Sequence, residues 1–284
     1  TYAAITGEYE EFPNLCFVDT LDNVGLHTSA VGTNADLFGS VSEENVARIK
    51  RQNSKKISVF IDNPPYNANQ ANENDNNKNR EYPSIDRRIK DTYIAESTAQ
   101  KTKLYDMYSR FFRWASDRVA DNGIIAFVSN SSFIDSRTFD GFRKVLANEF
   151  NEIRIIDLKG NARTSGERRR QEGGNIFDDQ IRVGVAIWFC VKKKGAHGCN
   201  ILYESVRDYA KVEEKREFVS SRRLSDRRFE IVRPNAANNW INLADNDFES
   251  LIPIALKATK NAANSKSIFT LFSQGVKTNR DEWV

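Results

Sequence analysis

The sequence has few cysteines and lacks any long apolar run. Cys16, Cys190 and Cys199 are too few, and odd in number, for a disulfide framework, so we expect them to stay reduced. The longest apolar run, residues 183–191, has the length of a strand and is far shorter than the ~18 residues of a membrane-spanning helix. These absences exclude a disulfide-rich secreted domain and a transmembrane protein. They predict a cytoplasmic protein with no membrane partner.

The chain also has little net charge and few potential metal ligands. Its 42 Lys and Arg residues against 39 Asp and Glu residues leave a formal net charge of +3, so any affinity for a polyanion must come from local patches. His197 and Cys199 are two residues apart, but two potential ligands on a turn do not make a metal site, and we predict none. Hydrophobic residues make up 39% of the sequence, which is enough for a core and excludes disorder throughout.

Short apolar runs alternate with amphipathic segments along the first two thirds of the chain. This pattern predicts an α/β fold, in which helices cover a mostly parallel sheet. The predicted strands are Leu15–Asp19, Ile57–Asp62, Gly123–Asn130, Ile153–Leu158 and Arg182–Val191. The predicted helices cover residues 43–52, 104–119 and 136–150, and Asn122-Gly123 is a plausible stop for the second of them.

Two stretches interrupt this alternation. Residues 67–79 are rich in Asn and contain almost nothing apolar, so we predict a mobile loop there. After residue 200 the alternation fades into a charged segment, 207–233, which favours a solvated helical linker. We therefore predict a catalytic core at 1–200, followed by a linker and the start of a target-recognition region at 201–284.

The motif with the clearest chemistry is Asn63-Pro64-Pro65-Tyr66, directly after the predicted strand 57–62. Ligands of open α/β sheets bind beyond the carboxyl ends of the strands. Two consecutive prolines hold the backbone rigid, so the Asn63 side-chain oxygen and the Pro64 carbonyl can both accept hydrogen bonds from one planar amino group. Tyr66 offers a flat face beside them. The same four residues also suit a rigid turn that ends a strand.

This arrangement suits methylation of an aromatic amine. The exocyclic nitrogen of adenine is a poor nucleophile because its lone pair is delocalised into the ring. Two acceptors that bind its hydrogens favour a pyramidal nitrogen and stabilise the positive charge that grows as it attacks a methyl group. No general base is needed before the transfer.

The motif resembles that of the amino-group methyltransferases that use S-adenosylmethionine, whose adenine-specific DNA members carry Asn-Pro-Pro-Tyr. Residues 16–22 resemble the family strand whose terminal acidic residue contacts the cofactor, which implies that role for Asp19. Residues 104–106 and 123–131 resemble the helix and strand that follow in the family. The resemblance implies a Rossmann-like methyltransferase fold whose last strand is antiparallel and whose first strands are missing from this chain.

The stretch from Gly160 to Phe177 is similar to type ISP restriction-modification enzymes, and the likeness extends from about Tyr9 to the last residue. It implies that Phe177 stacks on the face of an extruded base opposite to Tyr66. It further implies a prokaryotic adenine-N6 methyltransferase that acts on double-stranded DNA and is fused to helicase and nuclease parts. A basic rim around the base pocket would bind DNA and consists of Arg163, Arg168, Arg169, Arg170 and Arg182.

The 14 glycines include no Gly-x-Gly pair, although cofactor binding in this fold depends on a Gly-rich turn. We therefore expect that the chain begins after that turn, binds S-adenosylmethionine weakly or not at all, is inactive alone, and exposes an incomplete sheet edge. The missing turn also favours an alternative, a non-catalytic DNA-binding specificity module. A protein-glutamine or ribosomal-RNA methyltransferase is another alternative, because these families share the motif.

Overall fold

The computed structural model describes residues 5–9, 12, 15–16, 18–22, 43–65, 82–98, 102–177, 181–241, 251–252, 254 and 267–269. The chain divides into two compact units, residues 1–242 and 243–284. In the second unit, the Phe269 backbone N–H donates to the Ile254 carbonyl at 2.8 Å. Within the described ranges, every helix is too short or too polar to cross a membrane.

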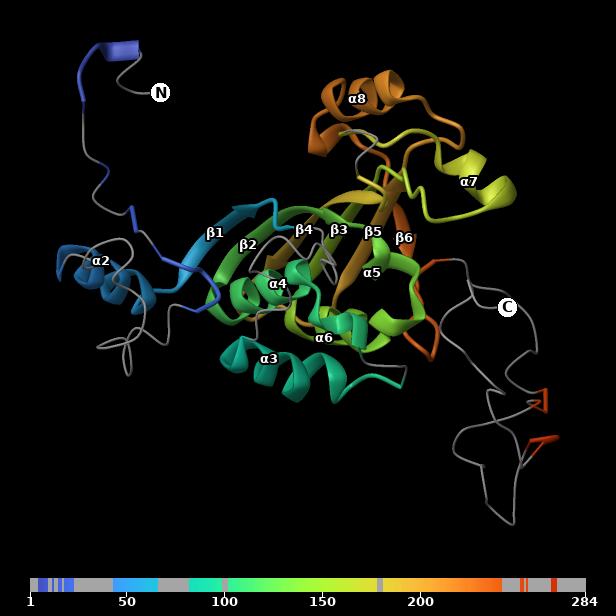
Figure 1. Ribbon diagram of the computed structural model, residues 1–284, viewed down its shortest axis with the longest axis horizontal. Coiled ribbons are helices and arrows are strands. Elements are labelled where there is room, and N and C mark those ends of the chain that lie inside the picture. Colours follow the sequence, from blue (N-terminus) through green and yellow to red (C-terminus); the bar gives the residue numbers. More distant parts are fainter. Residues whose placement is uncertain are drawn as a thin grey trace, which may run out of the picture. The chain divides into compact units, whose positions relative to one another are not determined.

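A six-stranded sheet in the first unit has the order β1-β2-β4-β3-β5-β6 (Figure 1). Its strands are β1 (Ile57–Asp62), β2 (Val119–Asn130), β3 (Glu152–Asp157), β4 (Val185–Lys192), β5 (Asn200–Ser205) and β6 (Glu230–Val232). Parallel pairing joins β1 to β2 and β3 to β5, whereas β4 runs antiparallel to both β2 and β3. The α/β fold with an antiparallel last core strand, β4, is therefore confirmed.

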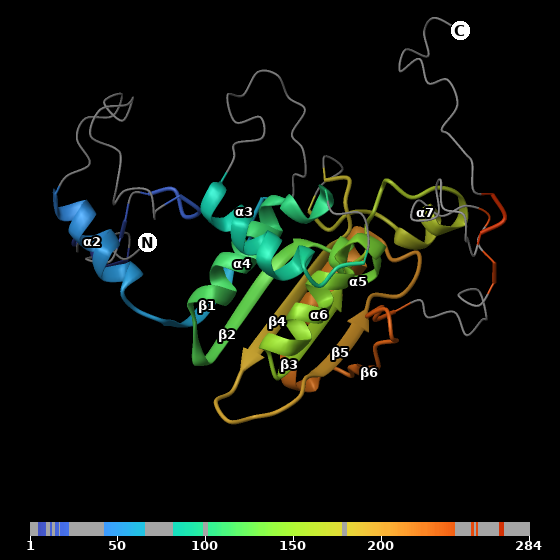
Figure 2. The ribbon, with the colours of Figure 1, turned by 90° about the horizontal axis from the view of Figure 1, so that it is seen from below.

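Helices cover one face of this sheet. Figure 2 shows α3 (Pro83–Ile89), α4 (Met107–Arg118) and α6 (Asp140–Glu149) over the same face. Near them lie α5 (Ser132–Asp135) and the short turns η3 (Lys90–Ile94), η4 (Thr102–Tyr105) and η5 (Arg137–Phe139). The remaining helices are α2 (Glu43–Asn53), α7 (Gly166–Glu172), α8 (Val212–Ser220) and the turn η6 (Leu224–Asp226).

Aromatic rings fill the space between these helices and the sheet. Trp188 of β4 lies 4.5 Å from Phe112 of α4 and 4.4 Å from Phe133 of α5, measured between ring centroids. All three rings are buried. The Trp188 indole N–H donates to the Ser129 hydroxyl at 2.9 Å, so its polar atom is satisfied inside the core. The packing fixes β2 and β4 against the helices and so holds the strand ends in place.

Two of the predicted elements differ from the structure. The described residues of the predicted strand Leu15–Asp19 belong to no strand, because a turn follows in which the Asp22 N–H donates to the Asp19 carbonyl and the Leu21 N–H to the Asp19 side chain. Helix α4 ends at Arg118 rather than at Asn122-Gly123. The backbone becomes extended at Val119, and Gly123 lies inside β2.

The sheet continues past residue 200. Strand β5 pairs with β3, and β6 pairs with β5. Strand β6 lies within the charged segment 207–233, so this segment adds a strand to the sheet and is not only a solvated linker. Lys215 of α8 is fully buried. The functional division predicted at residue 200 stays a prediction. The predicted loop at residues 67–79 lies outside the described residues.

Candidate active site

The carboxyl end of β1 presents the first residues of the Asn-Pro-Pro-Tyr motif. Asn63 and Pro65 are exposed, whereas Pro64 between them is buried. The Asn63 backbone N–H donates to the Asp62 carboxylate at 2.8 Å. Burial raises the pKa of the Asp62 carboxyl, and the hydrogen bond from Asn63 opposes that shift. Tyr66 lies outside the described residues.

Sheet topology places the loop that bears Phe177 at the same end of the sheet as Asn63. β1, β2 and β3 run in the same direction, so their carboxyl ends lie at one end of the sheet, and the antiparallel β4 begins there. Asn130, the last residue of β2, is opposite Val185, the first residue of β4. The loop that follows α7 leads into β4 at this point. Two motifs that are more than a hundred residues apart in the sequence therefore lie at the same end of the sheet, on strands separated only by β2.

Phe177 presents an exposed ring on a backbone held from inside. Its side chain is 46% exposed, which is unusual for a phenylalanine. The side chain of Asn175 is buried; its amide nitrogen donates to the Val183 carbonyl at 2.9 Å, and its amide oxygen accepts from the Phe177 N–H at 3.1 Å. A buried polar anchor thus holds the Phe177 backbone while the side chain is partly exposed, which suits stacking on a planar partner.

The predicted basic rim divides into paired and unpaired arginines. Arg168 forms an ion pair with Asp135 at 2.5 Å, and Arg170 with Glu167 at 2.7 Å. Arg169 donates to the Gly173 carbonyl at 2.8 Å. Arg163 and Arg182 are exposed, and neither has an ion-pair partner in the part of the chain that the structure describes. These two keep a full positive charge available for a polyanion.

A polar cavity of about 470 Å³ opens at the carboxyl ends of β2, β3 and β5. Asp157 lies in its wall and accepts hydrogen bonds from the Tyr203 hydroxyl at 2.9 Å and the Lys159 N–H at 2.8 Å. Burial raises the pKa of the Asp157 carboxyl. Lys159 pairs with Asp208 across the cavity. Among the described residues, no group of three His, Cys, Asp or Glu side chains could hold a metal ion.

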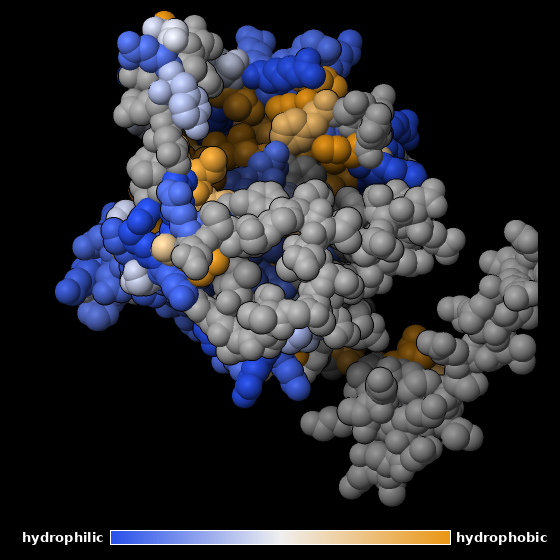
Figure 3. All heavy atoms as spheres, turned by 60° about the vertical axis from the view of Figure 1, so that its left-hand side comes forward, coloured by the Kyte–Doolittle hydropathy of each residue, from blue (hydrophilic) through white to orange (hydrophobic). Residues whose placement is uncertain are grey.

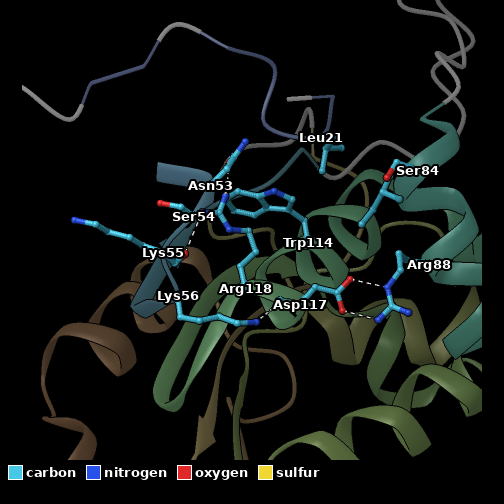
Figure 4. A pocket seen from close by; sticks show the side chains of 11 residues that line it. Leu21, Asn53, Ser54, Lys55, Lys56, Ser84, Arg88, Trp114, Asp117 and Arg118 are labelled. Carbon is cyan, nitrogen blue, oxygen red and sulfur yellow. Dashed lines mark hydrogen bonds and ion pairs between the residues drawn. The ribbon is translucent and has the colours of Figure 1, made fainter. Parts of the chain in front are cut away.

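A second cavity, of about 400 Å³, lies at the opposite end of β1 from Asn63 (Figure 4). Trp114 and Arg118 from the end of α4 line it, and the Arg118 guanidinium lies 5.2 Å from the Trp114 ring centroid. The Lys56 ammonium donates to the Asp117 carbonyl at 2.7 Å. Because this cavity is at the amino ends of β1 and β2, it is separate from the candidate active site.

Asp19, the predicted cofactor contact, is exposed and already engaged. One carboxylate oxygen accepts from the Leu21 N–H at 3.0 Å, and the other accepts from the Tyr82 hydroxyl at 3.3 Å. A carboxylate has capacity for further hydrogen bonds, so Asp19 fits a cofactor contact. It is a single contact, and the sequence provides no Gly-rich turn beside it. The residues present therefore fit one part of an S-adenosylmethionine site.

Sequence reasoning missed the buried residues whose hydrogen bonds hold the backbone of the Phe177 loop. Asn175 stands two residues before Phe177, and an Asn at this spacing is a signal for a local side-chain turn. Lys215 gave no such signal, because a lysine in a charged segment is normally solvated. Its ammonium is buried and donates to the carbonyls of Glu172 and Gly174.

Comparisons with known proteins show the family of this chain. The family model described as Eco57I restriction-modification methylase matches residues 18–163, just over half of the chain. A structure titled as a DrdV–DNA complex is 56% identical to this chain, with a TM-score of 0.85 and coverage of 100% of this chain and 27% of that chain. No curated protein sequence matches.

Two type ISP restriction-modification enzymes are also similar. LlaGI, a nuclease-deletion mutant in complex with a DNA substrate mimic, is 36% identical, with a TM-score of 0.78 over 89% of this chain and 20% of that chain. LlaBIII, bound to DNA, is 32% identical, with a TM-score of 0.81 over 99% and 18%. The chain spans about a quarter or less of the length of these three relatives. It belongs to the Eco57I restriction-modification methylase family, in agreement with its predicted resemblance to the type ISP enzymes.

Proposed function

We propose that the chain carries the base-binding part of a DNA adenine-N6 methyltransferase in a restriction-modification enzyme. The observation that supports this proposal is that Asn63 and the Phe177 loop lie at the same end of the sheet, where the carboxyl ends of β1, β2 and β3 meet the start of β4. Asn63 is exposed above the buried Pro64, and Phe177 is exposed above the buried Asn175. An extruded adenine would occupy the space beyond this end of the sheet, with Phe177 on one face of the base and Tyr66 on the other.

In this proposal Asn63 and Pro64 act on the amino group of the base. The Asn63 side-chain oxygen and the Pro64 carbonyl accept its two N–H groups, while Pro65 keeps the turn rigid. The acceptors stabilise the positive charge that develops on the nitrogen as it bonds to the methyl group. S-adenosylmethionine would supply that methyl group. Asp19 would contact the cofactor, and we infer that this chain alone binds it weakly and is inactive because it has no Gly-rich turn.

The DNA partner in this proposal is a duplex from which the adenine is extruded. Extrusion costs a few kcal/mol, and stacking on one aromatic ring contributes ~1–3 kcal/mol, so two rings would roughly offset the cost. Arg163 and Arg182 would bind phosphates, and Arg168, Arg169 and Arg170 would join them if DNA displaces their present partners. Fused helicase and nuclease parts, proposed for the complete polypeptide, agree with the much greater length of the relatives.

Replacement of Asn63 tests the proposal in the complete polypeptide. Asn63→Ala removes one of the two acceptors, so we expect methyl transfer to fall by ~10²-fold or more. The measurement is tritium incorporation into DNA from labelled S-adenosylmethionine, with the methylated base identified by mass spectrometry. Asn148→Ala, at an exposed position in α6, is the matched control and should incorporate normally. Near-normal incorporation by Asn63→Ala, or methylation of a base other than adenine, would reject the proposal.

A further inference from the structure

The loop before β4 is held by an element beyond the predicted catalytic core. Lys215 of α8 donates from its ammonium to the Glu172 carbonyl at 2.8 Å and to the Gly174 carbonyl at 2.6 Å. Its side chain has no exposed surface. No carboxylate lies within 4.0 Å of that ammonium among the residues described, so its hydrogen bonds go to the backbone of the Phe177 loop.

The segment before Lys215 also packs closely along this loop. The Tyr209 N–H donates to the Gln171 carbonyl at 3.0 Å. Gly173 has a φ of +64°, and a Cβ added there would lie 2.2 Å from the Ala210 carbonyl oxygen, so glycine is required for this close approach. A Cβ at Gly174 would lie 2.8 Å from the Val212 side chain. Residues 209–215 and 171–175 therefore form one packed unit, and Figure 1 shows α7 and α8 close together.

A fully buried ammonium is costly for stability, and hydrogen bonds to buried acceptors offset part of that cost. Burial lowers the pKa of Lys215 to about 8, which reflects that cost. The two carbonyls that it binds precede Asn175, whose amide in turn fixes the Phe177 N–H. The contacts therefore form a continuous path from α8 through Lys215, Gly174 and Asn175 to the exposed ring.

We propose that Lys215 is a positioning residue for Phe177, and that α8 thereby belongs to the base-binding machinery. The proposal rests on the proposed function, because it assumes that Phe177 stacks on the extruded base. A ring already held in its stacking position loses less conformational freedom when the base arrives. Loss of Lys215 would remove the ammonium donor from the Gly174 carbonyl and leave the Glu172 carbonyl with the Gly160 N–H, so the loop could move while Asn63 stays in place.

A double-mutant cycle in the complete polypeptide tests this inference. The variants are Lys215→Met, Phe177→Ala and the double variant, assayed on a duplex that carries the enzyme's mapped methylation site. We expect each single variant to lower kcat by about tenfold, which corresponds to loss of one base-stacking contact, with KM for S-adenosylmethionine unchanged. The double variant should lose no more than Phe177→Ala alone, because both changes act through the same ring. Lys215→Arg, which keeps a cation and its donors, should recover part of the activity.

Arg227→Met is the matched control. Arg227 is also a buried cation that holds α8, through the Phe218 and Val219 carbonyls, and it pairs with Glu204 of β5; among the described residues it has no hydrogen bond to the Phe177 loop. Its effect on kcat should multiply with that of Phe177→Ala. Hydrogen exchange should increase at residues 173–177 in Lys215→Met and not in Arg227→Met.

The outcomes separate this inference from the proposed function. Full activity of Phe177→Ala would reject stacking by Phe177, and with it the role of Lys215. A loss in Phe177→Ala with normal activity in Lys215→Met, or a loss that multiplies in the double variant, would reject the positioning role alone. Folding of each variant is verified by its thermal midpoint.

Discussion

Asp62 is the carboxylate directly before the candidate base-binding residue, and its half-buried position disfavours the ionised form. Burial raises its pKa, so the contribution of this group to stability is full below its unfolded pKa and is lost as the pH rises through its folded pKa. Asp62→Asn keeps an oxygen that can accept the Asn63 N–H, which the carboxylate now accepts at 2.8 Å, and removes the charge. We therefore expect this variant to have a higher free energy of unfolding at pH 7.

The gain should shrink as the pH is lowered, because protonation neutralises Asp62 in the native protein as well. Urea unfolding at pH 7 and at pH 4.5 measures the difference. Asp121→Asn in β2 is the control, since Asp121 is exposed and its replacement should leave the free energy of unfolding nearly unchanged at both pH values. An equal or larger gain at pH 4.5 than at pH 7 would contradict the role of burial.

Helix α6 is joined to a distant segment through one buried side chain. Arg143 is fully buried and donates to the Phe133 carbonyl at 2.9 Å and the Ser136 carbonyl at 2.8 Å. It also donates to the Asn238 carbonyl at 2.6 Å, across 95 residues of sequence. Its guanidinium therefore fixes the segment that places Trp240 in the core.

Arg143→Leu would remove the guanidinium donors from these carbonyls, of which Ser136 keeps the Phe139 N–H, so we expect the free energy of unfolding to fall by about 3 kcal/mol. Denaturant unfolding measures the change, and hydrogen exchange should rise at residues 238–240. Lys144→Leu is the control in the same helix. Its half-exposed ammonium pairs with Glu96, and loss of such a pair costs about 1 kcal/mol or less. Equal effects of the two substitutions would contradict the role assigned to Arg143.

Sequence reasoning found the elements whose signal is local. Strands β1 to β4 are runs of apolar residues, and α4 and α6 show apolar residues at helical spacing, so their residue types alone predict them. Strand β5 was missed because it is short and partly polar, and because its pairing with β3 depends on residues about 48 positions earlier. Trp240 lies in the segment 201–284 for which we predicted a linker and the start of a recognition region, although the core buries it through contacts that no local pattern contains.

The same distinction applies to the candidate site. The Asn63 motif and Phe177 were predicted because residue types and family resemblance mark them. Lys215 was not, because it binds backbone carbonyls, and a carbonyl leaves no trace in residue identity. Buried polar anchors of this kind are visible in a structure and seldom in a sequence.

At the scale of the whole molecule, the two faces and the two edges of the sheet differ. Helices α3, α4 and α6 cover one face, whereas apolar residues remain exposed on β1 and β2. Val59 is 56% exposed and Ile61 is 83% exposed, and both lie on β1 at the end of the strand order. Figure 3, which brings the β1 side forward, shows hydrophobic surface open toward solvent. Within the described ranges no strand pairs with the outer side of β1.

An unpaired edge with exposed apolar side chains favours pairing with another copy of the chain. We therefore expect the 284-residue chain to associate at increasing concentration and Ile61→Lys to reduce that association, because a lysine on the edge strand must lose its hydration if a second strand pairs there. Sedimentation velocity over a concentration series measures the change. Ile5→Lys, at an 81% exposed position outside the sheet, is the matched control and should associate like the parent chain. Equal relief of association by both lysines would mean that general charge repulsion, rather than the β1 edge, governs self-association.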